Sequence, residues 1–265
     1  MLRLLLVLSS ILTASSAVEG GRPPALVRIQ ELADRALASG ETPIAVFDLD
    51  DTLVQTVMRS RRALEKALGA TGHPELIAKL PKDPHDDSYL VRDTLDGVCQ
   101  RTGACIKSQE EKDRIGQSWS AAFFSGDGVD LDAAVDGCAA KYVSALREAG
   151  VLVVYLTGRP TVEMRRATAS QLNKLQFPTG AGTVLLMKPA GDQPDLAFKL
   201  EMATAIRKLG PVVASFENEP ANVDALSAAF PGAASIFLET RHSPGAPEVW
   251  KTIERIDRFC DRRAR

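Results

Sequence analysis

Short apolar runs alternate with amphipathic segments through most of the chain. A helix is expected over 24–39, where apolar residues recur at helical spacing up to Gly40, and a buried strand over 44–47. From Ala139 onward the alternation is regular. It predicts strands at 151–156, 183–187, 212–216 and 235–238, helices at 139–149, 162–175, 197–209 and 222–230, and a C-terminal helix from about Pro247. Strands that alternate with helices indicate an α/β fold with a mostly parallel, Rossmann-like sheet flanked by helices.

The region from 58 to 136 interrupts this alternation. A helix is expected over 59–68, ending at Gly69, and is followed by polar loops and short helical pieces. We therefore divide the chain into a core made of 18–57 and 137–265 and a mainly helical insertion over 58–136. Because the insertion follows the first core strand, we expect it to lie over the carboxyl ends of the strands.

The N-terminus and the composition bound the cellular setting. Residues 1–17 combine Arg3, an apolar run and small residues near Ala14 and Ala17, a pattern typical of a secretory signal peptide. We therefore expect an exported protein, periplasmic or secreted, with no membrane span after cleavage; the alternative is an uncleaved membrane anchor. A net charge of -2 gives no overall basic field for nucleic acid. The oligomeric state is not indicated.

Export makes the four cysteines candidates for disulfides. Four cysteines allow three pairings, and the sequence does not choose among them. Cys99 and Cys105 are close enough to close a local loop, and that choice would leave Cys138 with Cys260. Free buried thiols are the alternative.

Three carboxylates follow the first strand directly, at Asp48, Asp50 and Asp51, before Thr52. If the chain stays extended, Asp48 and Asp50 point to the same side, because side chains alternate along a strand. A bound cation would relieve the repulsion between them. The simpler interpretation is a strand-end turn, in which Asp is common.

The motif F-D-L-D-D-T-L resembles the first signature of the haloacid dehalogenase superfamily, in its phosphatase branch. The resemblance implies that Asp48 is a nucleophile that forms an aspartyl-phosphate and that Asp50 is the general acid and base. The insertion at 58–136 is similar to the helical cap of many members. V-L-V-V-Y-L-T-G-R resembles the second signature, which implies that Thr157 and Gly158 bind the substrate phosphoryl group; Arg159 is a further candidate for facing the substrate.

The third and fourth signatures have weaker counterparts. The resemblance implies an active-site lysine, for which we favour Lys199 over Lys188. The fourth signature usually presents an Asp after its strand, but this chain has Glu217 there. We expect Mg²⁺ to be bound by Asp48, Asp50 and Glu217. Two further residues, Asn222 and Asp224, are candidates for a ligand or for a partner of a ligand.

Together these motifs imply a Mg²⁺-dependent phosphomonoester hydrolase, similar to exported acid phosphatases, that acts on a small phosphorylated substrate outside the cytoplasm. A phosphonatase or dehalogenase is an alternative within the superfamily. An alternative of another class is a non-catalytic binding module that has lost the fourth signature, for which Glu217 is the evidence. His242 follows the last predicted strand, either as a substrate contact or as an ordinary loop residue.

Overall fold

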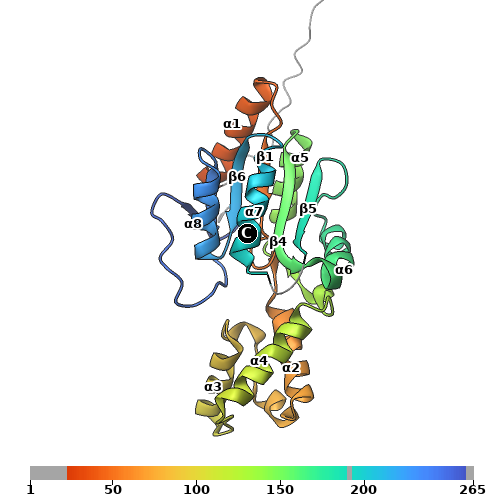
Figure 1. The fold of residues 1–265 in the computed structure, drawn as a ribbon, viewed down its shortest axis with the longest axis vertical. Helices are drawn as coiled ribbons and strands as arrows, with labels where there is room; N and C mark the ends of the chain where they lie inside the picture. Colours follow the sequence, from red (N-terminus) through yellow and green to blue (C-terminus); the bar gives the residue numbers. More distant parts are fainter. Residues whose placement is uncertain (1–22, 190–192, 261–265) are drawn as a thin grey trace, which may run out of the picture.

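A computed structural model describes residues 23–189 and 193–260. The predicted signal peptide at 1–17 lies outside the described residues. The chain forms an α/β core and a smaller helical lobe below it (Figure 1). Among the described residues, no helix is both long and apolar enough to cross a membrane.

The core is built on a parallel sheet whose central strand, β1 (Ile44–Phe47), is buried at every position. All neighbouring strands in the sheet pair in parallel. A strand covered on both faces has apolar residues at every position, which explains the unbroken apolar runs in the sequence. The sheet order is β5 (Thr183–Lys188), β4 (Leu152–Pro160), β1, β6 (Val212–Glu217), β7 (Ala234–Leu238) and β8 (Glu254–Ile256).

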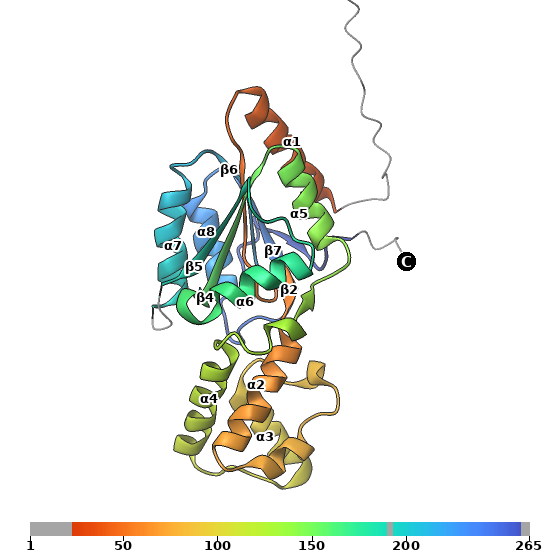
Figure 2. The same cartoon turned by 90° about the vertical axis from the view of Figure 1, so that its right-hand side faces the viewer.

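Helices cover both faces of the sheet, as Figure 2 shows from the side. On one face α1 (Pro24–Ala38) and α5 (Ala139–Glu148) bury apolar residues against Phe47 and Tyr155. On the other face α7 (Asp195–Ile206) and α8 (Pro220–Ala229) pack on Val46 and Val154. α6 (Thr161–Lys174) follows β4 and contacts β4 and β5. The predicted fold class is confirmed.

The predicted C-terminal helix from about Pro247 is wrong. Residues 246–250 are irregular, and the chain then adds β8 to the sheet beside β7. The spacing of Trp250, Ile253 and Ile256 suggested a helix face, yet Trp250 is half exposed, Ile253 is buried in a turn, and Ile256 is buried in β8. Pairing with β7 gives the backbone its hydrogen bonds, so the segment needs no helix.

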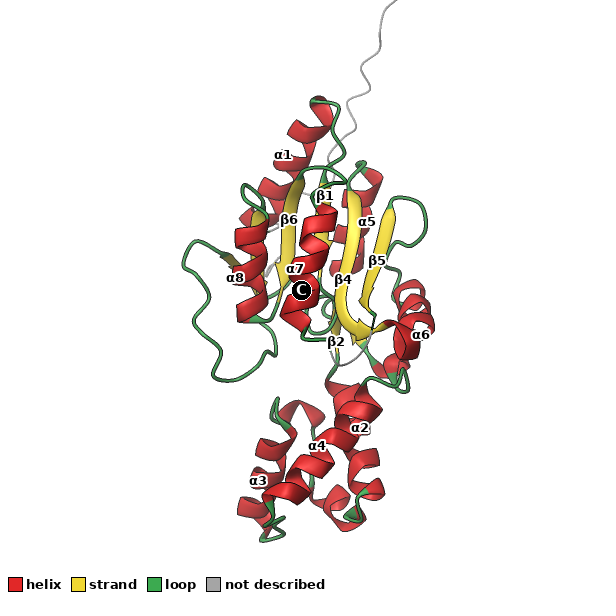
Figure 3. Cartoon of the chain, in the orientation of Figure 1, coloured by secondary structure: helices red, strands yellow, loops and turns green. Residues whose placement is uncertain are grey.

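The insertion is an almost wholly helical lobe, with α2 (Val57–Ala70), α3 (Val91–Thr102) and α4 (Gln109–Phe123) drawn in red in Figure 3. Short 3₁₀ turns lie at Pro74–Lys79, Pro84–Asp86 and Val129–Leu131. The chain leaves the core along β2 (Val54–Gln55) and returns along β3 (Ala133–Ala134), and these two strands pair antiparallel. The lobe has its own apolar core, which includes Leu64, Leu68, Leu95, Val98 and Ile115. The domain boundaries at 57/58 and 136/137 stay predictions.

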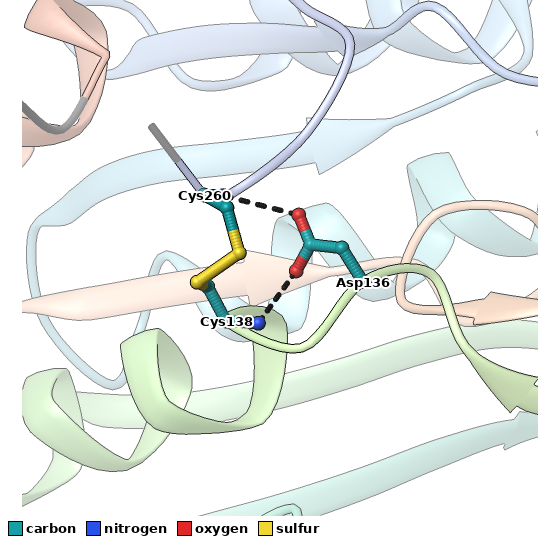
Figure 4. Close-up of side chains that lie close together, drawn as sticks. All are labelled: Asp136, Cys138 and Cys260. Carbon is teal, nitrogen blue, oxygen red and sulfur yellow. Dashed lines mark hydrogen bonds between the residues drawn. A yellow bond between two sulfur atoms is a disulfide. The ribbon is translucent and has the colours of Figure 1, made fainter. Parts of the chain in front are cut away.

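The cysteines form two disulfides, Cys99–Cys105 within the lobe and Cys138–Cys260 between the start of α5 and the C-terminal segment. Beside the second one, one carboxylate oxygen of Asp136 accepts the N–H of Cys138 at 2.8 Å (Figure 4). The other accepts the N–H groups of Phe259 at 2.6 Å and Cys260 at 3.1 Å. Disulfide and carboxylate together bind the C-terminal segment to α5.

The two disulfides should stabilise the protein unequally. Cys138–Cys260 closes a loop with a sequence separation of 122, against 6 for Cys99–Cys105. In the chain-entropy description, we expect the free energy of unfolding to fall by on the order of 5 kcal/mol in Cys138→Ser/Cys260→Ser, and by on the order of 2 kcal/mol in Cys99→Ser/Cys105→Ser. Urea denaturation of both variants measures this, and equal losses would contradict it.

Candidate active site

A cavity of about 980 Å³ lies between the carboxyl edge of the sheet and the helical lobe. Residues from the ends of β1, β4, β5 and β6 form its floor, and α4 forms part of the opposite wall. This is the edge at which parallel α/β sheets bind ligands. The lining includes these residues singled out in the sequence: Asp48, Asp50, Thr157, Gly158, Lys188, Glu217 and Asn222.

The turn after β1 separates the three acids. Asp48 continues the strand, since its N–H donates to the carbonyl of Phe216, and it is only 6% exposed. Asp51 adopts a positive φ of 57°, which an L-residue rarely takes and which Asp tolerates better than most. Its carboxylate accepts the N–H and the hydroxyl of Thr56, both at 2.9 Å, and so fixes the start of α2. Of the three acids, Asp51 is therefore the one with a structural role.

Lys199, on α7, contacts the predicted nucleophile directly. Its Nζ lies 2.8 Å from Asp48 Oδ1 and 2.6 Å from Glu217 Oε2, and all three side chains are buried. Burial acts to lower the pKa of Lys199, but the charges of Asp48 and Glu217 outweigh it and raise the pKa. The geometry therefore supports Lys199 over Lys188 as the lysine beside Asp48.

Glu217 ends β6 with its carboxylate held in place. Its Oε1 accepts the N–H groups of Asn218 and Glu219, each at 3.1 Å, while Oε2 binds Lys199. Burial, together with the charge of Glu217, raises the pKa of Asp48 well above its usual value. Two neighbouring carboxylates repel each other when both are ionised, and a bound cation would offset this repulsion. Asp48 and Glu217 therefore fit a site for a hard cation such as Mg²⁺.

The other two candidate metal ligands, Asn222 and Asp224, differ in their position and contacts. Asn222 is buried and lines the cavity, whereas Asp224 accepts the N–H of Trp250 at 3.1 Å. His242 packs against Phe237 with ring centroids 5.7 Å apart, and its neighbour Arg241 lines the cavity instead.

Another group of possible ligand atoms is not a metal site. Three such atoms of described residues also come together at Asp136, Cys138 and Cys260. Both sulfurs there belong to the disulfide, and the carboxylate accepts backbone N–H groups (Figure 4). No thiolate is therefore left there to bind an ion.

Asp50 belongs to a buried ring of alternating charges. Its Oδ1 lies 2.5 Å from Nη2 of Arg59, on α2, and 2.5 Å from Nη2 of Arg159, on β4. The same two arginines contact Asp132, at 3.2 and 3.4 Å, on the segment returning from the lobe. Gln171 on α6 donates to Asp132 and accepts from Arg159, both at 2.8 Å. The ring therefore joins both connections of the lobe to the core.

The ring determines the ionisation of Asp50. Burial acts to raise the pKa of Asp50, but the charges of Arg159 and Arg59 hold this pKa well below its usual range. Burial raises the pKa of Asp132 to about 6 despite the charge of Arg59. The two arginines therefore hold Asp50 in its ionised form. Arg159, a candidate substrate contact in the sequence, is fully buried in the ring.

Sequence reasoning did not find Arg59, Asp132 or the cavity wall. Arg59 lies in a predicted helix, where a charged residue normally faces solvent, and its guanidinium instead stacks over Phe123 at 4.1 Å from the ring centroid. Phe123 also stacks on Trp119 at 5.0 Å, and both line the cavity. In the sequence, the apolar and aromatic motif W-S-A-A-F-F was the signal that could have indicated this wall of the cavity.

Comparison with known proteins supports the fold. No protein-family model matches the chain, and no curated protein matches it. Among solved structures, a predicted phosphoglycolate phosphatase from Haemophilus somnus is similar, with 15% identity, coverage of 77% of this chain and 89% of that one, and a TM-score of 0.51. A candidate phosphatase from Clostridium difficile has 12% identity, the same coverage and the same TM-score. At this identity the similarity shows the fold alone, an α/β core with a parallel sheet flanked by helices.

The charge ring gives a pH prediction. Replacing Asp50 with Asn leaves two buried arginines facing one carboxylate, so we expect the free energy of unfolding to fall by about 3 kcal/mol at neutral pH. Because the pKa of Asp50 is lower in the folded state, its contribution is present above about pH 4 and is lost as the pH falls further. The difference between wild type and Asp50→Asn should therefore narrow below about pH 4.

Denaturant unfolding at several pH values measures this difference. Asp34→Asn is the matched control, because Asp34 is an exposed carboxylate on α1 remote from the ring. A gap between wild type and Asp50→Asn that stays constant down to about pH 3 would contradict the prediction.

Proposed function

We propose that this protein is a Mg²⁺-dependent phosphomonoester hydrolase that acts through an aspartyl-phosphate at Asp48. The observation that carries the proposal is the ammonium of Lys199, which lies 2.8 Å from Asp48 and 2.6 Å from Glu217, two residues that line the cavity. A nucleophilic carboxylate, a cation beside it and a second acid able to hold a metal are the parts that this chemistry requires. The phosphatase names of the similar structures agree with this proposal.

In the first step an oxygen of Asp48 attacks phosphorus, a bond to phosphorus forms, and the bond to the leaving oxygen breaks. The hydroxyl of Thr157 and the ammonium of Lys199 donate hydrogen bonds to the phosphoryl oxygens. Asp48, the backbone carbonyl of Asp50 and Glu217 would hold Mg²⁺, which would supply positive charge to offset the anionic phosphoryl group.

In the second step water attacks the phosphorus of the aspartyl-phosphate, which releases phosphate and restores Asp48. In the first step Asp50, protonated, gives its proton to the leaving oxygen, and in the second step it takes a proton from the attacking water, which restores the starting form. The charges of Arg159 and Arg59 lower the pKa of Asp50 and so disfavour the protonated form that begins this cycle.

The proposed site of action is outside the cytoplasm, periplasmic or secreted. Two lines of support are the signal-like N-terminus and the pairing of all four cysteines in disulfides, which persist in oxidising compartments. The substrate is proposed to be a small phosphomonoester that fits the cavity beneath α4.

Asp48→Asn tests the nucleophile. We expect phosphate release from a panel of phosphomonoesters to require Mg²⁺, to stop with a chelator, and to fall by at least about 10³-fold in Asp48→Asn, because an amide is a poor nucleophile. The assay measures inorganic phosphate released by the mature protein. Full activity in Asp48→Asn would refute the mechanism.

Glu217→Gln tests the metal site against the non-catalytic alternative. We expect calorimetry to show Mg²⁺ binding in the wild type and binding weakened about 10-fold or more in Glu217→Gln, because a charged ligand is lost. Asp224→Asn is the control and should bind Mg²⁺ like wild type, since Asp224 instead accepts the N–H of Trp250. A wild type that binds no Mg²⁺ would favour the binding module.

A further inference from the structure

Lys188 is a buried cation for which the proposed mechanism has no role. It ends β5, is 8% exposed and lines the cavity. Its ion-pair partner among the described residues is Asp195, with Nζ and Oδ1 3.4 Å apart. Charged hydrogen bonds are normally about 2.7–2.9 Å long, so this contact leaves much of the hydrogen-bonding capacity of the ammonium unused. A buried ammonium in this state is suited to an anion that enters the cavity.

Asp195 connects Lys188 to the predicted phosphoryl site. Its carboxylate lies between the two lysines, 3.4 Å from Lys188 and 3.9 Å from Lys199. It also lies against Gly158, because a Cβ added to that glycine would be 1.9 Å from Asp195 Oδ1. The residue after Thr157 must therefore be glycine for Asp195 to occupy this place. In the β4–β5 ladder Thr157 pairs with Met187, the residue before Lys188.

The charges around Asp48 explain why a second cation is needed. Lys199 already serves two carboxylates, Asp48 and Glu217, at hydrogen-bond distance. With Asp195 included, three carboxylates face two ammonium groups. Without Lys188, the single ammonium of Lys199 would face all three carboxylates. A phosphoryl dianion would be repelled more strongly by such a cluster.

The nearby arginines do not fill this role. Arg59 and Arg159 are both buried and engaged in the ring with Asp50 and Asp132. Arg241 lines the cavity but donates to the carbonyl of Ser88 on the lobe. Lys188 is thus the cation on the sheet side that is both buried and weakly paired.

We propose that Lys188 is a second phosphoryl-binding cation, which acts with Lys199 on the same phosphoryl group. This inference rests on the proposed function, since it assumes that a phosphoryl group binds beside Asp48. It assigns to the end of β5 a binding role separate from the nucleophile and from the predicted metal ligands. Lys199 offsets the charge of Asp48 and Glu217 as well as that of the phosphoryl oxygens, whereas Lys188 offsets the charge of the phosphoryl oxygens.

Inorganic phosphate is the probe, because it binds without turnover. Calorimetric titration with phosphate in the presence of Mg²⁺ is expected to show affinity about 10- to 100-fold weaker in Lys188→Met than in wild type, and partly restored in Lys188→Arg. Lys174→Met is the matched control, because Lys174 is exposed on α6 and donates to the carbonyl of Asp130. Thermal unfolding establishes that each variant is folded, and Lys188→Gln replaces Lys188→Met if the latter does not fold.

The outcomes separate this inference from the proposed function. Equal phosphate affinity in wild type and Lys188→Met would overturn the inference, while metal-dependent turnover that Asp48→Asn abolishes would leave the hydrolase intact. Conversely, Lys188-dependent phosphate binding in a protein without turnover would support the inference and refute the hydrolase. If Lys188→Met slowed turnover only for substrates with a second anionic group and left phosphate affinity unchanged, the assignment to the phosphoryl group would be wrong.

Discussion

The arrangement of this protein depends on the alternation of charge in the ring formed by Asp50, Arg59, Asp132 and Arg159. A buried charge is tolerated only when opposite charges and hydrogen bonds replace the water it has lost. Each member of the ring comes from a different segment: the loop after β1, α2, the segment returning from the lobe, and the end of β4. The ring is complete only when the lobe and the core are both correctly placed, so it couples the position of the lobe to the loop that carries the nucleophile.

A second group of buried side chains also combines opposite charges. Asp48, Glu217 and Lys199 form a separate buried group on the other side of the turn. The longer side chain of Glu217 fits because its second oxygen accepts two backbone N–H groups, which anchor the carboxylate over the end of β6. These two hydrogen bonds therefore hold Glu217 in the position where an Asp is usual, and its carboxylate still belongs to the group that contains Asp48.

The sequence predicted what local patterns determine. Buried strands appear as unbroken apolar runs, so the predicted first strand matches the observed β1, Ile44–Phe47. Once the strands were predicted, the residues directly after them could be predicted to lie at the carboxyl edge of the sheet. The predicted C-terminal helix was wrong because apolar residues three apart also occur where a turn leads into a strand. Ile253 lies in such a turn and Ile256 in β8, and both are buried. The ring was not predictable, since Arg59 and Asp132 are 73 residues apart and Arg159 and Asp50 are 109 apart. Only tertiary packing shows which of many charged residues become partners.

The position of the last buried aromatic residue has a consequence for vectorial synthesis. Phe259 packs against Tyr142 and Phe216, with ring centroids 5.6 and 5.7 Å away. Because a chain is made from its N-terminus, this cluster is completed only after Phe259 has been made, long after Tyr142. The central strand must likewise wait for β6, more than 160 residues later, before both its edges are paired. The core is therefore completed only when segments far apart in the chain have all been made.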